Sequence, residues 1–162
     1  MSEGGMARRD PHRYVFRSTW RLLSPPHVVY EALADVEGYP SWWNQVRGGR
    51  RFDEHSGEIV CRSLLPYDLT FVIRRVIEDP VKRILRAELS GDLNGTSQWT
   101  VSPASGGTVA VFDEDVTVGN GLLKAAGLAA RPALRFNHDL MMRAGERGLR
   151  RHLAGQRDAQ GA

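Results

Sequence analysis

The chain has a single cysteine and no long apolar run. Cys61 has no partner for an internal disulfide, which fits a reducing compartment such as the cytoplasm. No stretch approaches the roughly 20 apolar residues that a membrane-spanning helix needs, so we expect no transmembrane segment. The opening MSEGGMARRD has basic residues but no apolar stretch after them, and we expect no secretory signal. These features together predict a cytoplasmic protein.

Familiar catalytic and cofactor motifs are also missing. The sequence contains no G-x-S-x-G motif, no P-loop and no dinucleotide-binding glycine pattern. Its histidines are scattered and do not stand at the spacing of zinc ligands. We therefore expect no bound metal and no cofactor.

The charge balance is only mildly basic, with 22 Lys and Arg against 19 Asp and Glu. The arginines that crowd residues 131–157 are interleaved with acidic residues, as on a solvated helix face. No helix-turn-helix, zinc or RNA-binding signature accompanies them. We expect no nucleic-acid partner.

Length and composition indicate one globular domain. The 162 residues are 41% hydrophobic and 25% charged, which is ordinary for a protein with a substantial core. Residues 1–13 are polar and rich in Gly and Arg, which predicts a flexible N-terminal tail. The domain is predicted to span residues 14–154, and residues 155–162 to form a disordered C-terminal tail.

The hydrophobic periodicity changes along the chain. Residues 14–23 alternate as in a half-buried strand, and Ser24-Pro25-Pro26 begins a helix that runs to Ala34. A short helical turn is expected at residues 41–44. Strand-like runs with short turns between them then follow, which makes neighbouring strands antiparallel. These runs are Val46–Phe52, Glu58–Leu65, Leu69–Glu78, Arg83–Ser90, Gly91–Val101 and Thr108–Val118.

A long C-terminal helix is expected over Asn120–Leu153, kinked or split at Pro132. Its inward face carries unusual residues, among them Gly145 and Gly148. Glycine costs roughly 1 kcal/mol against alanine in a helix interior, so its presence needs a reason. The glycines either let the helix lie close to a sheet or leave a hollow beneath it. We predict an α+β fold in which this helix closes a curved sheet over a ligand cavity.

The element order and several local sequences resemble the polyketide cyclase/dehydrase and lipid-transport family of the START-like (SRPBCC) superfamily. The stretches that carry the likeness are Tyr39-Pro40-Ser41-Trp42-Trp43, Leu65-Pro66-Tyr67-Asp68-Leu69, Gly91-Asp92-Leu93-Asn94-Gly95, Gln98-Trp99-Thr100, Phe136-Asn137-His138 and Met142–Leu149. The resemblance implies a helix-grip fold like that of the birch-pollen allergen. It predicts a seven-stranded antiparallel sheet wrapped around the C-terminal helix, with two short helices after the first strand. This superfamily has no universal catalytic motif to carry over.

Aromatic and polar side chains on the inward parity are the candidate ligand-binding residues. Aromatic rings give large, rigid apolar contact area that suits planar or hydrophobic ligands. A plain core role remains the alternative for each aromatic residue. The candidates are Trp20, Trp42, Trp43, Phe71, Arg75, Trp99, Phe112, Asn137 and Met141.

Glu114 and His138 are the candidate catalytic residues. The apolar parity of Phe112 and Val116 places Glu114 inside, where related sequences favour a large aromatic residue. A carboxyl group in an apolar cavity could serve as a general acid or base. It could instead form a structural pair with Arg75. His138, on the inward face of the helix, could hydrogen-bond a ligand carbonyl or be a satisfied core residue.

The leading hypothesis is a protein that binds a hydrophobic or aromatic small molecule, either lipid-like or polyketide-like. One alternative is a cofactor-independent cyclase or dehydratase that uses the inward polar groups. Another is a protein-interaction module of the same fold, because one fold supports many functions.

Overall fold

The computed structural model describes residues 10–63, 68–119 and 121–161. Most of the predicted N-terminal tail lies outside these residues, as does the end of the predicted strand Glu58–Leu65. The predicted fold class is confirmed within the described part of the chain.

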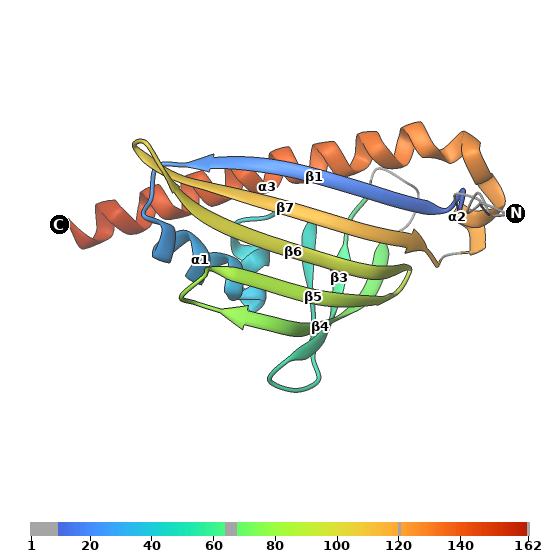
Figure 1. The fold of residues 1–162 in the computed structure, drawn as a ribbon, viewed down its shortest axis with the longest axis horizontal. Helices are drawn as coiled ribbons and strands as arrows, with labels where there is room; N and C mark the ends of the chain where they lie inside the picture. Colours follow the sequence, from blue (N-terminus) through green and yellow to red (C-terminus); the bar gives the residue numbers. More distant parts are fainter. Residues whose placement is uncertain (1–9, 64–67, 120, 162) are drawn as a thin grey trace, which may run out of the picture.

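The described residues form a seven-stranded antiparallel sheet with the strand order β1-β7-β6-β5-β4-β3-β2 (Figure 1). Alternating apolar residues favour strands here, and from β2 to β7 each strand pairs with the next one in the chain. β1 pairs with β7, so β1 and β2 form the two edges. The strands are β1 (Arg13–Leu22), β2 (Val46–Arg51), β3 (Ser56–Cys61), β4 (Leu69–Asp79), β5 (Ile84–Gly91), β6 (Leu93–Ala104) and β7 (Gly107–Val118).

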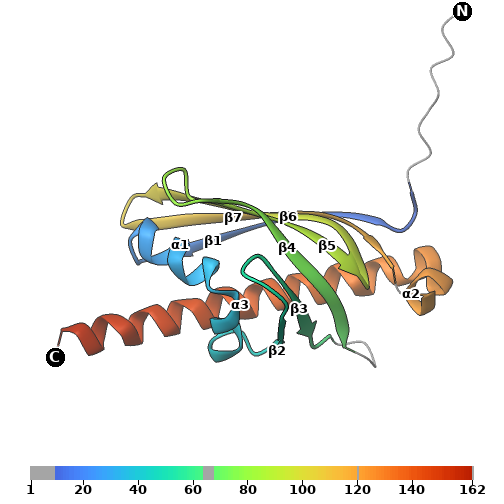
Figure 2. The ribbon, with the colours of Figure 1, turned by 90° about the horizontal axis from the view of Figure 1, so that it is seen from below.

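Two short helices, α1 (Pro26–Ala34) and η1 (Val36–Ser41), connect β1 to β2. The predicted turn at residues 41–44 is displaced toward the N-terminus, because the Asp35 side chain accepts a hydrogen bond from the Gly38 backbone N–H and begins η1 earlier. Figure 2 shows the sheet curving around one side of the C-terminal helix, with β2 and β3 turned toward it.

The C-terminal segment is divided where proline predicted a break. α2 (Gly121–Ala126) and η2 (Gly127–Ala130) precede α3 (Arg131–Gln160), which has Pro132 in its first turn. Proline is tolerated there because the first helical N–H groups have no intrahelical acceptor. α3 continues past the predicted helix end at Leu153 to Gln160. Residues 155–160, predicted as part of a C-terminal tail, form the last turns of this helix.

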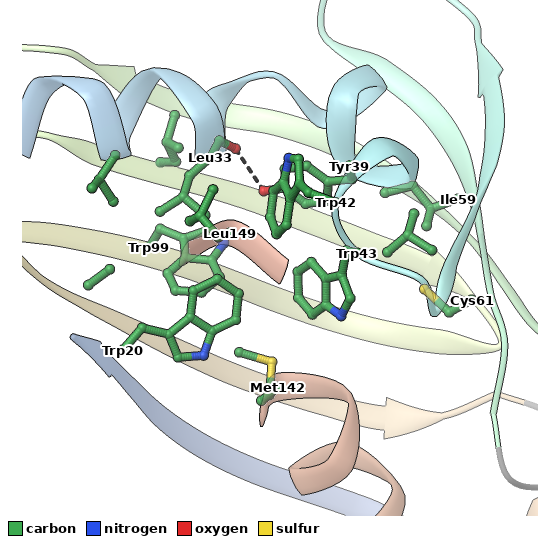
Figure 3. Packing of buried hydrophobic residues seen from close by; sticks show 14 of the residues in the cluster. Trp20, Leu33, Tyr39, Trp42, Trp43, Ile59, Cys61, Trp99, Met142 and Leu149 are labelled. Carbon is green, nitrogen blue, oxygen red and sulfur yellow. Dashed lines mark hydrogen bonds between the residues drawn. The ribbon is translucent and has the colours of Figure 1, made fainter. Parts of the chain in front are cut away.

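A cluster of aromatic rings packs against the C-terminal half of α3 (Figure 3). The Trp20 ring lies 4.6 Å from that of Trp99, 5.4 Å from that of Trp43 and 6.5 Å from that of Trp42. The cluster joins β1, β6 and the segment after η1, elements far apart in the sequence.

The two inward glycines of α3 lie against this cluster. A Cβ atom at Gly145 would stand 2.6 Å from a Trp43 ring carbon, and one at Gly148 would stand 1.7 Å from the Trp42 backbone oxygen. Both distances are far shorter than a carbon van der Waals contact. The glycines therefore serve close approach, and the close contact is with the segment after η1.

Side chains of α3 also hold the helix against the edge strand β1. The Arg21 backbone N–H donates to Glu146 Oε1 at 2.9 Å, and Arg150 Nε donates to the Arg21 carbonyl at 2.9 Å. Arg150 also pairs with Glu146 at 2.8 Å. These bonds satisfy backbone groups of a strand that has no neighbour on that side.

Candidate functional site

A cavity of about 470 Å³ lies between the concave face of the sheet and α3. Its volume falls in the range of roughly 300–1,000 Å³ typical of small-molecule sites. The sheet contributes large apolar side chains, and the N-terminal half of α3 contributes another set. Examples of these lining residues are Ile59, Phe71, Leu85, Leu89 and Val116 from the sheet, and Leu134, Met141 and Met142 from α3.

Charged residues from η1 and from the β2–β3 connection line one border of the cavity. Arg51 Nη1 lies 3.6 Å from Glu37 Oε1, and both side chains are more than half exposed. Exposed ion pairs of this kind contribute little to stability. The pair therefore marks a solvated rim that contrasts with the apolar interior.

The predicted aromatic residues divide into two groups. Trp43 and Trp99 line the cavity, and the Trp99 ring lies 4.7 Å from the ring of Phe112, which also lines it. Trp20 and Trp42 do not line the cavity. They are buried in the aromatic cluster because the glycines of α3 bring the helix down onto it (Figure 3). Their placement corresponds to the plain core alternative.

Trp43 connects the cluster to the cavity wall. Its indole N–H donates to the backbone carbonyl of Met141 at 3.0 Å. Met141 itself lines the cavity, as do Phe71 and the buried Asn137. The Trp43–Met141 hydrogen bond thus fixes the distance between α3 and Trp43 where the packed core borders the cavity.

Glu114 and His138 meet across the cavity. Glu114 projects from β7 and is 8% exposed, and His138 projects from α3. Glu114 Oε2 and His138 Nε2 lie 3.4 Å apart. The strand parity and the helical spacing predicted each inward orientation separately, and the fold brings the two side chains together.

The His138 ring is held flat against Phe16 of β1. The two ring centres are 3.9 Å apart and the planes differ by 9°. Both ring nitrogens of His138 are buried and have no hydrogen-bond partner among the described residues. Stacking thus fixes the position of the imidazole while its polar edge remains without a partner.

Arg75 lines the cavity but does not pair with Glu114. Its guanidinium donates to the Ala34 carbonyl at 2.6 Å and to Glu78 Oε2 at 3.0 Å. The end of α1 leaves backbone carbonyls without helical partners, and Arg75 satisfies one of them. The predicted Arg75–Glu114 alternative is therefore wrong, since the ionisable side chain that Glu114 meets is that of His138.

Two further ionisable groups in the wall illustrate how dry it is. Burial raises the pKa of the Cys61 thiol to about 12. Burial also raises the pKa of Tyr39, whose hydroxyl donates to the Leu33 carbonyl at 2.7 Å. Both groups therefore remain neutral at physiological pH, and Glu114 and His138 are the acid/base candidates in the interior.

Tyr14 and Phe16 also line the cavity, in addition to the candidate binding residues predicted from the sequence. The alternation of β1 places both on the same side as Trp20, so the signal was present in the sequence. The stacking of Phe16 on His138 could not be predicted, because it depends on the lateral position of α3 over the sheet.

Among the described residues, no group of three or more His, Cys, Asp or Glu side chains could hold a metal ion. Within the same part of the chain, no helix is both long and apolar enough to cross a membrane.

Comparison with solved structures gives several matches to this fold. The Zhui aromatase/cyclase from a Streptomyces species matches with a TM-score of 0.69 and 16% identity, over 87% of this chain and 93% of that one. A START superfamily protein from Mycobacterium smegmatis matches with a TM-score of 0.65 and 14% identity, over 90% and 99%. At such identities the likeness concerns the fold.

No curated protein matches the sequence. The family model described as "Polyketide cyclase / dehydrase and lipid transport" matches residues 13–154. This match covers nearly the whole folded part, including both walls of the cavity. The chain therefore belongs to the polyketide cyclase/dehydrase and lipid-transport family.

Proposed function

We propose that this protein binds a hydrophobic or aromatic small molecule, lipid-like or polyketide-like, in the cavity between the sheet and α3. The observation that carries this proposal is a cavity of about 470 Å³ with a mainly apolar and aromatic wall. Apolar surface that stays unfilled forgoes contact energy, and a ligand of matching shape recovers it. The family match and the aromatase/cyclase and START neighbours support the same conclusion.

Pyrene, a planar hydrocarbon, is a suitable probe because its emission spectrum reports the polarity around it. We expect saturable binding, with an emission spectrum typical of an apolar environment. Ile73 lines the cavity, whereas its neighbour Val72 on β4 does not. The Ile73→Trp variant should weaken pyrene binding at least about tenfold, because the larger ring occupies ligand space.

The matched control is Val72→Trp, which adds a similar bulk to the other face of the same strand. It should leave pyrene affinity within about twofold of the parent. The absence of saturable pyrene binding to the folded protein would refute the proposal. Equal effects of the two variants would refute this cavity as the binding site.

A second candidate function is a cofactor-independent cyclase or dehydratase. The approach of Glu114 to His138 at 3.4 Å inside the cavity favours it. The Glu114 carboxylate would take a proton from the carbon beside a ligand carbonyl, and His138 would give a proton to the departing hydroxyl group. A carbon–carbon double bond then forms and water leaves.

A phenyl-substituted β-hydroxyketone tests this second function, because its dehydration gives a conjugated enone with strong ultraviolet absorbance. An enzyme should form the enone and lose turnover in Glu114→Gln while retaining pyrene affinity. A carrier should bind pyrene and form no enone.

A further inference from the structure

The wall of the cavity carries one buried polar pair whose bonding is incomplete. His138 Nε2 lies 3.4 Å from Glu114 Oε2, and this contact does not meet hydrogen-bond geometry. His138 Nδ1 lies 3.9 Å from Asp139 Oδ1, beyond hydrogen-bond distance, and neither ring nitrogen has a hydrogen-bond partner in the described chain. Buried polar groups without partners are rare in folded proteins, and each costs about 1–3 kcal/mol. A bound molecule is a natural source of the missing partner.

Stacking keeps the imidazole from turning away to find such a partner. The ring lies on Phe16 at 3.9 Å with planes 9° apart, and it is near-parallel to Phe112, at 6.4 Å and 20°. Its nitrogens can therefore bond only to groups near the ring plane, and Glu114 Oε2 stands 3.4 Å from Nε2. The pair therefore offers a hydrogen-bond donor, a His138 ring N–H, next to an acceptor, the Glu114 carboxyl group, among aromatic side chains.

The charges around the pair discriminate between ligand classes. A carboxylate ligand would be repelled by Glu114, since like charges in a poorly solvated site destabilise one another. An ammonium ligand has no acceptor for a His138 ring N–H. A pure hydrocarbon would leave the His138 ring nitrogens unpaired. A neutral hydroxyl group satisfies both Glu114 and His138, since it donates through its proton and accepts through its oxygen.

We propose that the Glu114–His138 pair anchors the hydroxyl group of a planar aromatic alcohol, that is, a phenol. The hydroxyl proton is donated to the Glu114 carboxylate, and the hydroxyl oxygen accepts a hydrogen bond from a His138 ring N–H. The rings of Phe16, Phe112 and Trp99 offer flat apolar surface to the rest of the ligand. This inference rests on the proposed small-molecule binding and names the ligand class that the same cavity takes.

Pyrene and two of its derivatives distinguish hydrogen bonding to the Glu114–His138 pair from simple hydrophobic binding. Pyrene reports cavity binding alone, hydroxypyrene adds a donor and acceptor, and methoxypyrene, substituted at the same carbon, adds only an acceptor. At neutral pH we expect hydroxypyrene to bind at least about tenfold more tightly than methoxypyrene, as befits a hydrogen bond to a charged group.

Two variants remove the two halves of the anchor independently. Glu114→Met removes the acceptor at similar volume, and His138→Phe removes the donor while keeping a ring to stack on Phe16. Each should reduce the preference for hydroxypyrene to about twofold or less. Pyrene affinity should not fall in either variant, because pyrene makes no hydrogen bond to the pair, and retained pyrene binding shows that the cavity is intact.

Equal affinities for hydroxypyrene and methoxypyrene in the parent protein, together with tight pyrene binding, would overturn the anchor and leave the proposed binding function standing. Persistence of the full preference in either variant would also overturn it. Failure of pyrene itself to bind would refute both proposals together.

Discussion

Alanine substitutions at three glycines of α3 test how closely the helix is packed. Gly148→Ala is the most severe, because its Cβ would lie 1.7 Å from the Trp42 backbone oxygen. Neither the Trp42 backbone nor α3 can move without disturbing the aromatic cluster. We expect destabilisation of about 3 kcal/mol or more, at the upper end of overpacking effects.

Gly145→Ala should have a smaller effect. Its Cβ would stand 2.6 Å from a Trp43 ring carbon and 2.8 Å from a Trp20 ring carbon. The Trp43 ring would have to move by about 0.9 Å to reach normal contact, although its N–H bond to Met141 holds it in place. Overpacking costs about 1–3 kcal/mol, and improved helix propensity returns about 1 kcal/mol. The net destabilisation should be about 1 kcal/mol.

Gly155→Ala is the matched control in the same helix, because no atom lies within 4 Å of its added Cβ. It should stabilise the protein by up to about 1 kcal/mol. The midpoint and slope of urea unfolding, followed by tryptophan fluorescence, measure all three variants. Similar unfolding midpoints for Gly148→Ala and Gly155→Ala would refute close packing of α3 at this end.

Three further predictions concern buried and charged groups elsewhere. Thr108→Val should cost about 1–3 kcal/mol in urea unfolding, because the buried hydroxyl donates to the Ser24 carbonyl at 2.7 Å; an unchanged midpoint would contradict this. Cys61, whose pKa burial raises to about 12, should react with an aromatic disulfide reagent far more slowly in the folded protein than in urea; equal rates would show an exposed thiol. The hydrogen bond from Arg13 and its charge lower the pKa of Asp115, so this pair stabilises the fold above the usual aspartate range, and the contribution disappears as the pH falls through the lowered pKa. Asp115→Asn should therefore lose slightly less stability than the parent on acidification to about pH 2, and the difference should be small because both side chains are about half exposed.

The sheet was predictable where a long strand has one buried face, as in β1 and β7. The alternation in β1 and β7 gave the correct inward residues, including Glu114, since a slip of one residue would expose the whole apolar set. Pro132 likewise marked the start of α3, because proline fits a first helical turn. These signals are local, and they survive without knowledge of the tertiary packing.

The division of the tryptophans between core and cavity was not predictable in the same way. Trp20 and Trp99 both have inward parity, yet one is enclosed in the cluster and the other borders empty space. The difference depends on how far α3 stands from the sheet at each point along its length. Strand alternation contains no information about that distance.

The partners of Arg75 could not be predicted from the sequence for a related reason. Its parity correctly placed it at the cavity, and Glu114 was an attractive partner of opposite charge. The Ala34 carbonyl at the end of α1 competes with Glu114 for the Arg75 guanidinium. This competition is visible only in the fold, which brings residues 34 and 75 together. Backbone acceptors at helix ends are frequent partners of arginine and leave no signature in sequence.

The two halves of α3 have different structural roles. The cavity under the N-terminal half depends on the close packing of the C-terminal half. Gly145 and Gly148 let the C-terminal half settle on the aromatic cluster, and the Trp43 bond to Met141 marks where this contact ends. The N-terminal half then crosses the cavity, with His138 stacked on Phe16 of β1. Its direction is already set by the C-terminal half, whose Glu146 and Arg150 bond to Arg21 of β1. An empty cavity costs contact energy, so it persists only where a neighbouring region is packed well enough to offset that cost. Close packing around the glycines is therefore the structural condition for the cavity in which Glu114 and His138 meet.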